Sequence, residues 1–222
     1  MVEMNPEARE FLRMTKQCCH TILPAEVADI GRLGRCYNDG IVKQQIERIL
    51  AGRKKRKIGG ENLKASAVLM PLFCKQGQYH LLFTERSDTV DSHKGQVCFP
   101  GGKYEAFDSS LLQTALRETE EEISLRAEDV EILGELDDIP TLTSDYVISP
   151  FVGFIPHPYP FRADSKEIRE IFSVPLSFLT DEANFREDFY SYQYEGHLIW
   201  GATARILRQF IDLLKSESGA RQ

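Results

Sequence analysis

The sequence has no long apolar run. No segment reaches the roughly 20 consecutive apolar residues that a helix needs to cross a bilayer. The first residues are interrupted by charged side chains at Glu3, Glu7, Arg9 and Glu10, so they do not form the apolar core of a secretory signal. We therefore expect a soluble, cytoplasmic protein with no membrane partner.

Cysteine is scarce and scattered. The chain has 5 cysteines, and none of them forms a Cys-x-x-Cys pair of the kind that holds zinc or acts as a redox couple. An odd, dispersed set is not typical of a disulfide-stabilised secreted protein, so reduced thiols are expected. Nothing in the spacing of Cys98 and His197 indicates a nucleophilic pair, and both are interpreted as structural.

Positive charge is in deficit. The 27 Lys and Arg residues face 34 Asp and Glu residues, which gives a net charge of -7. This balance argues against a general binder of nucleic-acid phosphates, and it disfavours an anionic substrate unless a cation bridges it to the protein. A basic run at 53–57 could contact nucleic acid, but such runs at helix ends are usually solvated faces that complement the helix dipole. Nucleic acid is not an expected partner.

The pattern of apolar residues divides the chain at about residue 60. Residues 1–60 show helical spacing at Ile41, Ile46 and Ile49, and they are predicted to form a helical N-terminal extension joined by a flexible link. Residues 61–222 form the main domain, in which strand-like and helical segments follow one another. The expected strands are at 67–73, 79–84, 130–136, 146–155, 189–194 and 198–200. A strand or a short helix is expected at 168–174, and a closing helix at 204–214.

A helix with several acidic residues is predicted soon after a glycine-rich turn. The turn contains Gly101 and Gly102, and either Asp108 or Ser109 is expected as the helix N-cap. The buried side of the helix is predicted to consist of Leu112, Ala115, Leu116, Thr119 and Ile123. With these residues docked against the core, the acids of the helix should face a cleft.

Three carboxylates of this helix are expected to converge. Helical geometry puts Glu118 beside Glu121 and Glu122, while Glu120 points elsewhere. Like charges this close repel one another, and a bound divalent cation replaces this repulsion with attraction. Hard oxygen ligands suit Mg²⁺ or Mn²⁺. Arg117 lies four residues before Glu121 and can pair with it, fixing its orientation.

The alternative is a solvated acidic helix face, which is the usual explanation of a Glu-rich helix. Two features oppose it. The glycine turn lets the backbone approach a ligand closely, and the apolar side of the helix indicates that it is docked. We therefore predict a metal site at Glu118, Glu121 and Glu122.

The segment 102–125 resembles the Nudix box, G-x5-E-x7-R-E-U-x-E-E-x-G-U, where U is a bulky apolar residue. Its second half begins at Arg117 and reads Arg-Glu-Thr-Glu-Glu-Glu-Ile-Ser-Leu. One extra residue precedes this half, and Asp108 takes the first acidic position. Thr119 replaces an apolar residue, and Ser124 replaces the glycine that ends the helix. The resemblance implies an α/β Nudix fold, with a mixed β-sheet sandwiched between helices, and a metal-dependent pyrophosphohydrolase.

The segment before the box resembles the signature of the coenzyme A diphosphatase branch of this family. It reads LFTERS over 82–87 and GQVCFPGG over 95–102. The branch pattern has an arginine four residues before Gly95, where this chain has Asp91. The resemblance implies hydrolysis of coenzyme A or acyl-coenzyme A to 3′,5′-ADP and the phosphopantetheine part.

The same resemblance implies roles for particular residues. Water attacks one phosphorus atom, the backbone carbonyl of Gly102 joins the glutamates as a cation ligand, and Arg117 orients the carboxylates. Nudix enzymes take the general base from the box or from a later loop, so Glu121 and Glu167 are the candidates. Weaker candidates for the base are Asp137, Asp138 and Glu170.

Substrate contacts are also predicted. Arg86, His93 and Lys94 are candidates to bind the 3′-phosphate or the diphosphate of coenzyme A. Tyr194 and Trp200 could stack on adenine, although aromatic residues in strands usually belong to the core.

Two alternatives to a coenzyme A diphosphatase stay open. The first is a Nudix diphosphatase that acts on ADP-ribose, NADH or another nucleoside diphosphate derivative. The second is a non-catalytic Nudix-fold binding module whose basic run contacts nucleic acid, against which the intact box glutamates count. A homodimer formed through the N-terminal helices is a further hypothesis.

Overall fold

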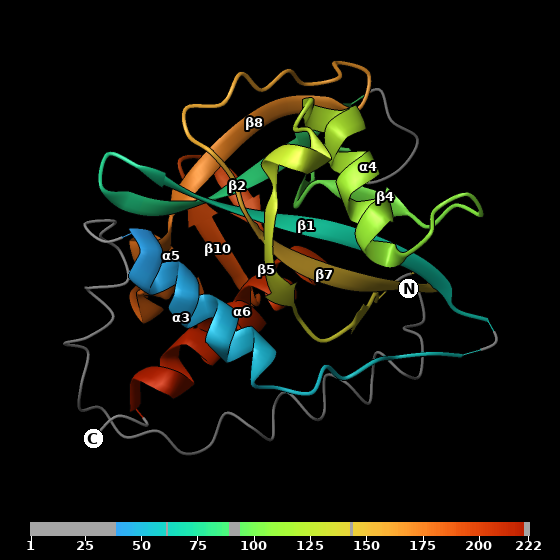
Figure 1. Ribbon diagram of the computed structural model, residues 1–222. Coiled ribbons are helices and arrows are strands. Elements are labelled where there is room, and N and C mark those ends of the chain that lie inside the picture. The colour runs from blue at the N-terminus through green and yellow to red at the C-terminus, as the bar shows by residue number, and fades with distance from the viewer. Residues whose placement is uncertain (1–38, 61, 89–93, 143, 220–222) are drawn as a thin grey trace.

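The computed structural model describes residues 39–60, 62–88, 94–142 and 144–219 (Figure 1). The strands are β1 (Lys64–Lys75), β2 (Gln78–Arg86), β3 (Val97–Cys98), β4 (Gly101–Lys103), β5 (Glu131–Glu135), β6 (Ile139–Pro140), β7 (Tyr146–Phe154), β8 (Ile168–Pro175), β9 (Phe185–Arg186), β10 (Ser191–Tyr194) and β11 (His197–Ile199). The α-helices are α3 (Asp39–Ala51), α4 (Leu111–Ile123), α5 (Leu176–Thr180) and α6 (Gly201–Gly219). None of the helices in the described residues has the length and apolar character that crossing a membrane requires.

A mixed sheet lies at the centre of the molecule. Its strand order is β3-β2-β1-β7-β5, with β4 paired to β1, β6 to β7 and β8 to β2. Strands β1 and β7 run parallel, and the other pairs of this sheet are antiparallel. A smaller sheet has the order β11-β10-β9.

Two hairpins predicted from the sequence are present. Gln76 and Gly77 connect β1 to β2 with φ values of 51° and 78°. Glu195 and Gly196 connect β10 to β11 with φ values of 46° and 92°. Positive φ at both central residues matches the right-handed twist of the flanking strands, which is why glycine stands at the second position of each turn.

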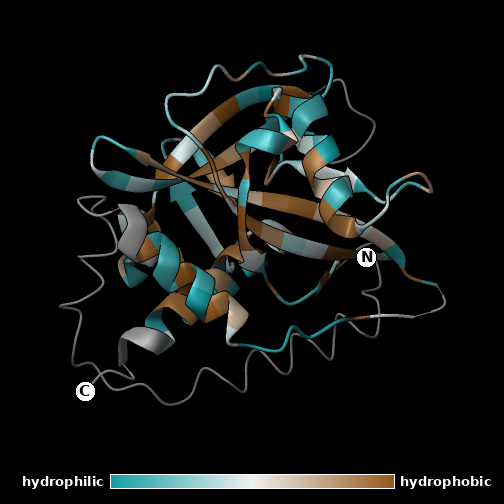
Figure 2. Ribbon diagram, viewed as in Figure 1, coloured by the Kyte–Doolittle hydropathy of each residue, from teal (hydrophilic) through white to brown (hydrophobic). Residues whose placement is uncertain are grey.

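Helices cover both faces of the central sheet (Figure 1). On one face, α4 buries Ala115 and Ile123 against a cluster that includes Leu69 and Leu82. On the other face, α3, α5 and α6 pack on a larger cluster. Figure 2 shows the central strands as largely apolar, whereas α3 and α4 carry both apolar and polar residues. The predicted mixed sheet between helices is confirmed.

Helix α3 belongs to the main hydrophobic core. Its residues Val42, Ile46, Ile49 and Leu50 are buried in the larger cluster, and Ile46 is 0% exposed. Gly134 of β5 makes room for this contact, because a Cβ there would lie 2.6 Å from the Cβ of Leu50.

The segment after α3 is held to the sheet, so the expectation of a flexible link is wrong. Arg53 pairs with Asp137. Lys55 pairs with Asp138 at 3.0 Å, and the backbone nitrogen of Ile58 donates to Oδ2 of Asp138 at 2.9 Å. Part of the basic run is therefore neutralised within the molecule, which counts against its use on nucleic acid.

Two smaller expectations also need correction. The N-cap of α4 is Ser110, whose hydroxyl accepts from the backbone nitrogen of Gln113 at 3.2 Å, rather than Asp108 or Ser109. Cys74 is disulfide-bonded, whereas Cys98 carries a free thiol.

The burial of α3 generates a stability prediction. Ile46→Ala removes a fully buried side chain and leaves a cavity, so the free energy of unfolding should fall by about 2 to 5 kcal/mol. Gln44→Ala, on the exposed side of the same helix, should change it by less than about 0.5 kcal/mol. Urea unfolding followed by circular dichroism measures both. If Ile46→Ala lowers the free energy of unfolding as little as Gln44→Ala does, the burial of α3 in the core is contradicted.

Candidate active site

The glycine turn before α4 brings backbone into close contact with two other elements. Gly101 has a φ of 148°, and a Cβ on it would lie 2.3 Å from the carbonyl oxygen of Ala67 in β1. A Cβ on Gly102 would lie 2.4 Å from the carboxyl carbon of Glu118. A side chain at Gly101 would collide with the backbone of β1, so this position requires glycine. A side chain at Gly102 would displace the carboxylate of Glu118, which lies directly against the turn.

Glu122 is the most deeply buried acid of the helix, with 2% of its surface exposed. Its Oε2 accepts a hydrogen bond from the backbone nitrogen of Gly101 at 3.1 Å, and Nη1 of Arg86 lies 3.8 Å from its Oε1. Burial raises the pKa of Glu122 to about 8. Burial also raises the pKa of Glu118, although hydrogen bonding to Arg117 opposes the shift.

Arg117 connects the acids of the box. Its Nε and Nη2 donate to the two oxygens of Asp108, each at 3.0 Å. Its Nη1 donates to Glu118 at 2.9 Å and to Glu121 at 3.1 Å, and Nη2 also reaches the carbonyl of Lys103 at 3.2 Å. This hydrogen bonding holds the pKa of Asp108 well below its usual range. Arg117 is thus fixed by a fork-like pair with Asp108 and in turn orients Glu118.

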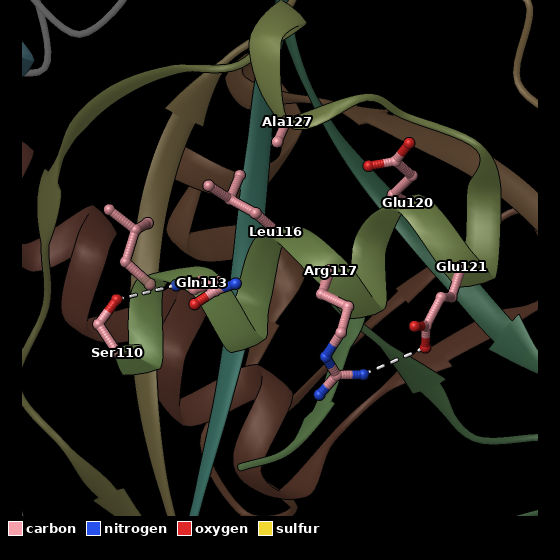
Figure 3. A pocket seen from close by; sticks show the side chains of 8 residues that line it. Ser110, Gln113, Leu116, Arg117, Glu120, Glu121 and Ala127 are labelled. Carbon is pink, nitrogen blue, oxygen red and sulfur yellow. Dashed lines mark hydrogen bonds and ion pairs between the residues drawn. The ribbon is translucent and has the colours of Figure 1, made fainter. Parts of the chain in front are cut away.

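Glu121 differs from the other two glutamates. Its side chain is 60% exposed and lies toward Arg117, as Figure 3 shows. Together with Glu120 and Leu116 it lines a hollow of about 410 Å³ on the outer side of α4. Neither Glu118 nor Glu122 lines this hollow, so it is separate from the place where the buried carboxylates meet.

Glu167 lies near the buried pair although it is far away in sequence. Its negative charge contributes to the raised pKa values of both Glu118 and Glu122. Its backbone is fixed by hydrogen bonds, since its carbonyl accepts from the nitrogen of Ser87 at 2.8 Å and its nitrogen donates to the backbone carbonyl of Asp164 at 2.9 Å. Glu167 is exposed, but its charge acts on the buried carboxylates of Glu118 and Glu122.

The weaker candidates for the base lie in other surroundings. Asp137 and Asp138 pair with Arg53 and Lys55 in the segment after α3. Glu170 lies in β8 opposite Glu85 and near His197. None of these three acids belongs to the group around Glu122.

Of the residues predicted to contact the substrate, the structure places Arg86 at the site. Arg86 lies beside Glu122, and its Nε is buried and makes no hydrogen bond to any described residue. Lys94 is exposed in a turn, and His93 lies outside the described residues. Tyr194 packs edge-on against Phe178 with ring centroids 4.8 Å apart.

Comparisons with known proteins fit this geometry. The NUDIX domain model matches residues 63–193. This chain belongs to the Nudix family. A Nudix hydrolase NudL of Photorhabdus laumondii, itself uncharacterised, is 38% identical over 159 residues, which cover 67% of this chain and 84% of the relative. Another, of Yersinia enterocolitica, is 33% identical over 190 residues, covering 81% of this chain and 94% of the relative.

Solved structures of low sequence identity share the Nudix fold. The NUDIX domain of Shewanella oneidensis NrtR, complexed with ADP ribose, aligns with a TM-score of 0.50 at 14% identity, over 70% of this chain and 90% of that one. A MutT/nudix family protein from Enterococcus faecalis also gives 0.50 at 14% identity, over 78% and 74%. The chain is a Nudix hydrolase, an enzyme of a family that acts on nucleoside diphosphate derivatives and generally uses divalent metals.

The departures from the Nudix box have local explanations. Thr119 is fully buried where an apolar residue is usual, and its hydroxyl donates to the carbonyl of Ala115 at 2.6 Å, so burial leaves no polar atom unpaired. Ser124 holds the left-handed conformation, with φ 57°, that the usual glycine would adopt. Its backbone nitrogen donates to the backbone carbonyl of Glu120 at 2.9 Å. Both residues preserve the shape of the Nudix helix.

The contact at Gly102 predicts the effect of one methyl group. In Gly102→Ala the added Cβ must displace the Glu118 carboxylate, and displacements of about 1 Å at a catalytic centre can lower turnover by about 100-fold. Gly59→Ala is the matched control, because a Cβ at Gly59 meets nothing within 4 Å. Steady-state hydrolysis of a nucleoside diphosphate substrate compares the two. Equal turnover would show that the position of Glu118 does not matter.

Burial of Glu122 predicts a pH dependence of the metal-free protein. The folded chain keeps the Glu122 proton up to a pKa of about 8, whereas the unfolded chain loses it near 4.5. The unfolded state therefore binds fewer protons between these values, and stability should fall as pH rises through that window.

Glu122→Gln should remove this loss. In EDTA, the variant should gain roughly 3 to 6 °C in Tm over the wild type at pH 8.5, as about 1 to 2 kcal/mol would give, and much less at pH 4.5. Differential scanning calorimetry at both pH values measures the difference. A Tm gain that does not grow with pH would contradict a raised pKa at Glu122.

Proposed function

We propose that this Nudix hydrolase cleaves the diphosphate bond of coenzyme A or acyl-coenzyme A, giving 3′,5′-ADP and the phosphopantetheine part. The observation that carries the catalytic part is the pair of Glu118 and Glu122 at the glycine turn, with Arg86 beside Glu122. The substrate is supported by the resemblance of 82–87 and 95–102 to the coenzyme A diphosphatase signature.

The donor set fits a hard divalent cation, Mg²⁺ or Mn²⁺. Carboxylates gathered in a buried place repel one another and resist ionisation, as the raised pKa values of Glu118 and Glu122 show, and a cation relieves both costs. The proposed ligands are Glu118, Glu121, Glu122 and the backbone carbonyl of Gly102. When bound, such a cation neutralises the diphosphate and makes a water molecule more acidic.

Glu167 is the proposed general base. Its charge acts on both Glu118 and Glu122, whereas the side chain of the other candidate, Glu121, is bonded to Arg117. Glu167 would take a proton from the attacking water as the bond between the attacked phosphorus and the bridging oxygen breaks. Arg117 is proposed to hold Glu118 and Glu121 in position.

Arg86 is the proposed phosphate contact. Its Nε is buried without a hydrogen-bond partner among the described residues, and a buried guanidinium N–H is well suited to donate to a phosphate oxygen. Its Nη1 lies 3.8 Å from Glu122, so a phosphate bound there would lie next to the carboxylates. His93 and Lys94 stay predictions for the 3′-phosphate, and cytoplasmic location and a homodimer likewise stay predictions.

ADP-ribose is the main alternative substrate. The NUDIX domain of NrtR was solved with ADP ribose bound and shares the fold, but at 14% identity it does not indicate the substrate of this chain.

The substrate proposal predicts the outcome of a product analysis. Incubation with Mg²⁺ or Mn²⁺ and coenzyme A should yield 3′,5′-ADP and 4′-phosphopantetheine, with a kcat/KM above that for ADP-ribose and NADH. Chromatography with mass detection separates these products. Intact coenzyme A together with cleaved ADP-ribose would contradict the proposed substrate and leave the diphosphatase activity in place.

The same assay compares the two candidate bases. Glu167→Gln should lower kcat by about 100-fold or more with little change in KM, as expected for loss of a general base. Glu121→Gln should have the smaller effect on kcat. A larger loss of kcat in Glu121→Gln than in Glu167→Gln would assign the base to Glu121.

A further inference from the structure

A second group of potential metal ligands lies outside the Nudix box. Glu85 of β2, Glu170 of β8 and His197 of β11 each offer one ligand atom, and these atoms lie within 4.8 Å of one another. Nδ1 of His197 is 3.3 Å from Oε2 of Glu85, and its Nε2 is 3.8 Å from Oε1 of Glu170. Three strands that are distant in sequence thus bring two carboxylates and one imidazole together.

The backbone register forces the two carboxylates close together. Glu85 and Glu170 are direct partners in the antiparallel pairing of β2 with β8. Like charges at directly opposed positions destabilise a sheet unless a positive charge lies between them. Arg169 supplies part of that charge, since its guanidinium pairs with Oε1 of Glu85 and lies 3.8 Å from Asp88.

The second oxygen of Glu85 is left without a hydrogen bond. Glu85 is 7% exposed, and its Oε2 is buried and accepts no hydrogen bond from any described residue. A buried carboxylate oxygen in this state carries a large desolvation cost. Nδ1 of His197 lies 3.3 Å from this oxygen, which therefore faces the centre of the group.

The imidazole of His197 is held in place from one side. Its ring stacks on Phe172 with centroids 3.8 Å apart and an interplanar angle of 10°. Its side chain is 16% exposed, so the group is mostly shielded from water while Glu170, at 50%, leaves a path to solvent. A ligand held in one orientation loses little freedom on binding a metal.

This group is distinct from the Nudix box. Successive residues of a strand point to opposite faces, so Glu85 and Arg86 diverge. Arg86 lies beside Glu122 on the face covered by α4, whereas Glu85 lies beside His197 of the small sheet.

We propose that Glu85, Glu170 and His197 form a second cation site that takes a divalent transition metal of the zinc type. Imidazole nitrogen with carboxylate oxygen suits Zn²⁺ or Co²⁺ better than Mg²⁺, which prefers oxygen ligands alone. Metal–ligand distances of about 2.0 to 2.2 Å put ligand atoms up to roughly 4 Å apart, so only small side-chain shifts are needed. The ion would bind one ring nitrogen of His197 together with one carboxylate oxygen each of Glu85 and Glu170.

Such an ion would cross-link the two sheets. Glu85 and Glu170 belong to the central sheet, and His197 belongs to the small one. Binding would stabilise the folded chain and hold the β10–β11 hairpin to β2 and β8.

The test measures Zn²⁺ bound by the full-length chain. After EDTA treatment, the wild type and variants are dialysed against Zn²⁺ in a large excess of Mg²⁺, which occupies the Nudix carboxylates, and the metal content is measured. His197→Gln and Glu170→Gln should each bind one Zn²⁺ fewer per chain than the wild type. His157→Gln is the control, because His157 also stacks on a phenylalanine, Phe73, at 4.9 Å, and it should bind as much as the wild type.

A second readout keeps the test decisive if His197→Gln does not fold. Glu170 is half exposed, so Glu170→Gln should fold normally, and the rise in Tm that Zn²⁺ produces in the wild type should be absent from it. Equal Zn²⁺ content in all four proteins, or an equal Tm rise in Glu170→Gln and the wild type, would overturn the proposal. Neither outcome depends on the substrate of the Nudix site.

Discussion

The carboxylate of Glu122 is buried against a turn in which Gly101 lies too close to the backbone of β1 for any side chain. Gly101 donates to that carboxylate and approaches β1, while Gly102 leaves room for Glu118. A buried acid of this kind carries a high cost in the absence of a positive partner. The other residues of the site hold Glu122 and the glycine turn in this position.

The surrounding elements hold the turn and the helix in register. Strand β1 pairs with β4 on one side and β7 on the other, so the turn is fixed to the centre of the sheet. Helix α4 is fixed by its apolar side and by Arg117, which is itself held by the buried Asp108. The structural role of Asp108 explains how the extra residue of the box is tolerated, because the acidic position still reaches the arginine.

Local patterns predicted much of the fold and the identity of the acidic helix. The two hairpins follow from glycine at a turn between apolar runs, and the left-handed end of α4 at Ser124 follows from the position of the box glycine. Periodicity did not separate Glu121 from Glu122, because adjacent helical positions differ by only 100° and both border the same face. The structure separates them, because the backbone nitrogen of Gly101 donates to Glu122, which is the buried one of the two.

Features that depend on contacts distant in sequence were not predicted. The attachment of the segment after α3 rests on acids that follow β5, 80 to 84 positions away. The group at Glu85 requires the register of β2 with β8 and the position of the small sheet, neither of which a sequence pattern gives. Glu167 was predicted as one of two leading candidates for the base, but its position relative to Glu122 could not be predicted, because it depends on where β8 begins.

The most direct test of the central claim is calorimetric titration of Mn²⁺ into the metal-free Glu122→Gln and Glu120→Gln variants. The two acids lie on the same helix, but Glu122 is buried at the turn and Glu120 is exposed on the outer side. The account predicts that Glu120→Gln binds Mn²⁺ as the wild type does and that Glu122→Gln binds it at least about 10-fold more weakly, a difference of about 1.4 kcal/mol. Equal affinity in both variants would contradict it.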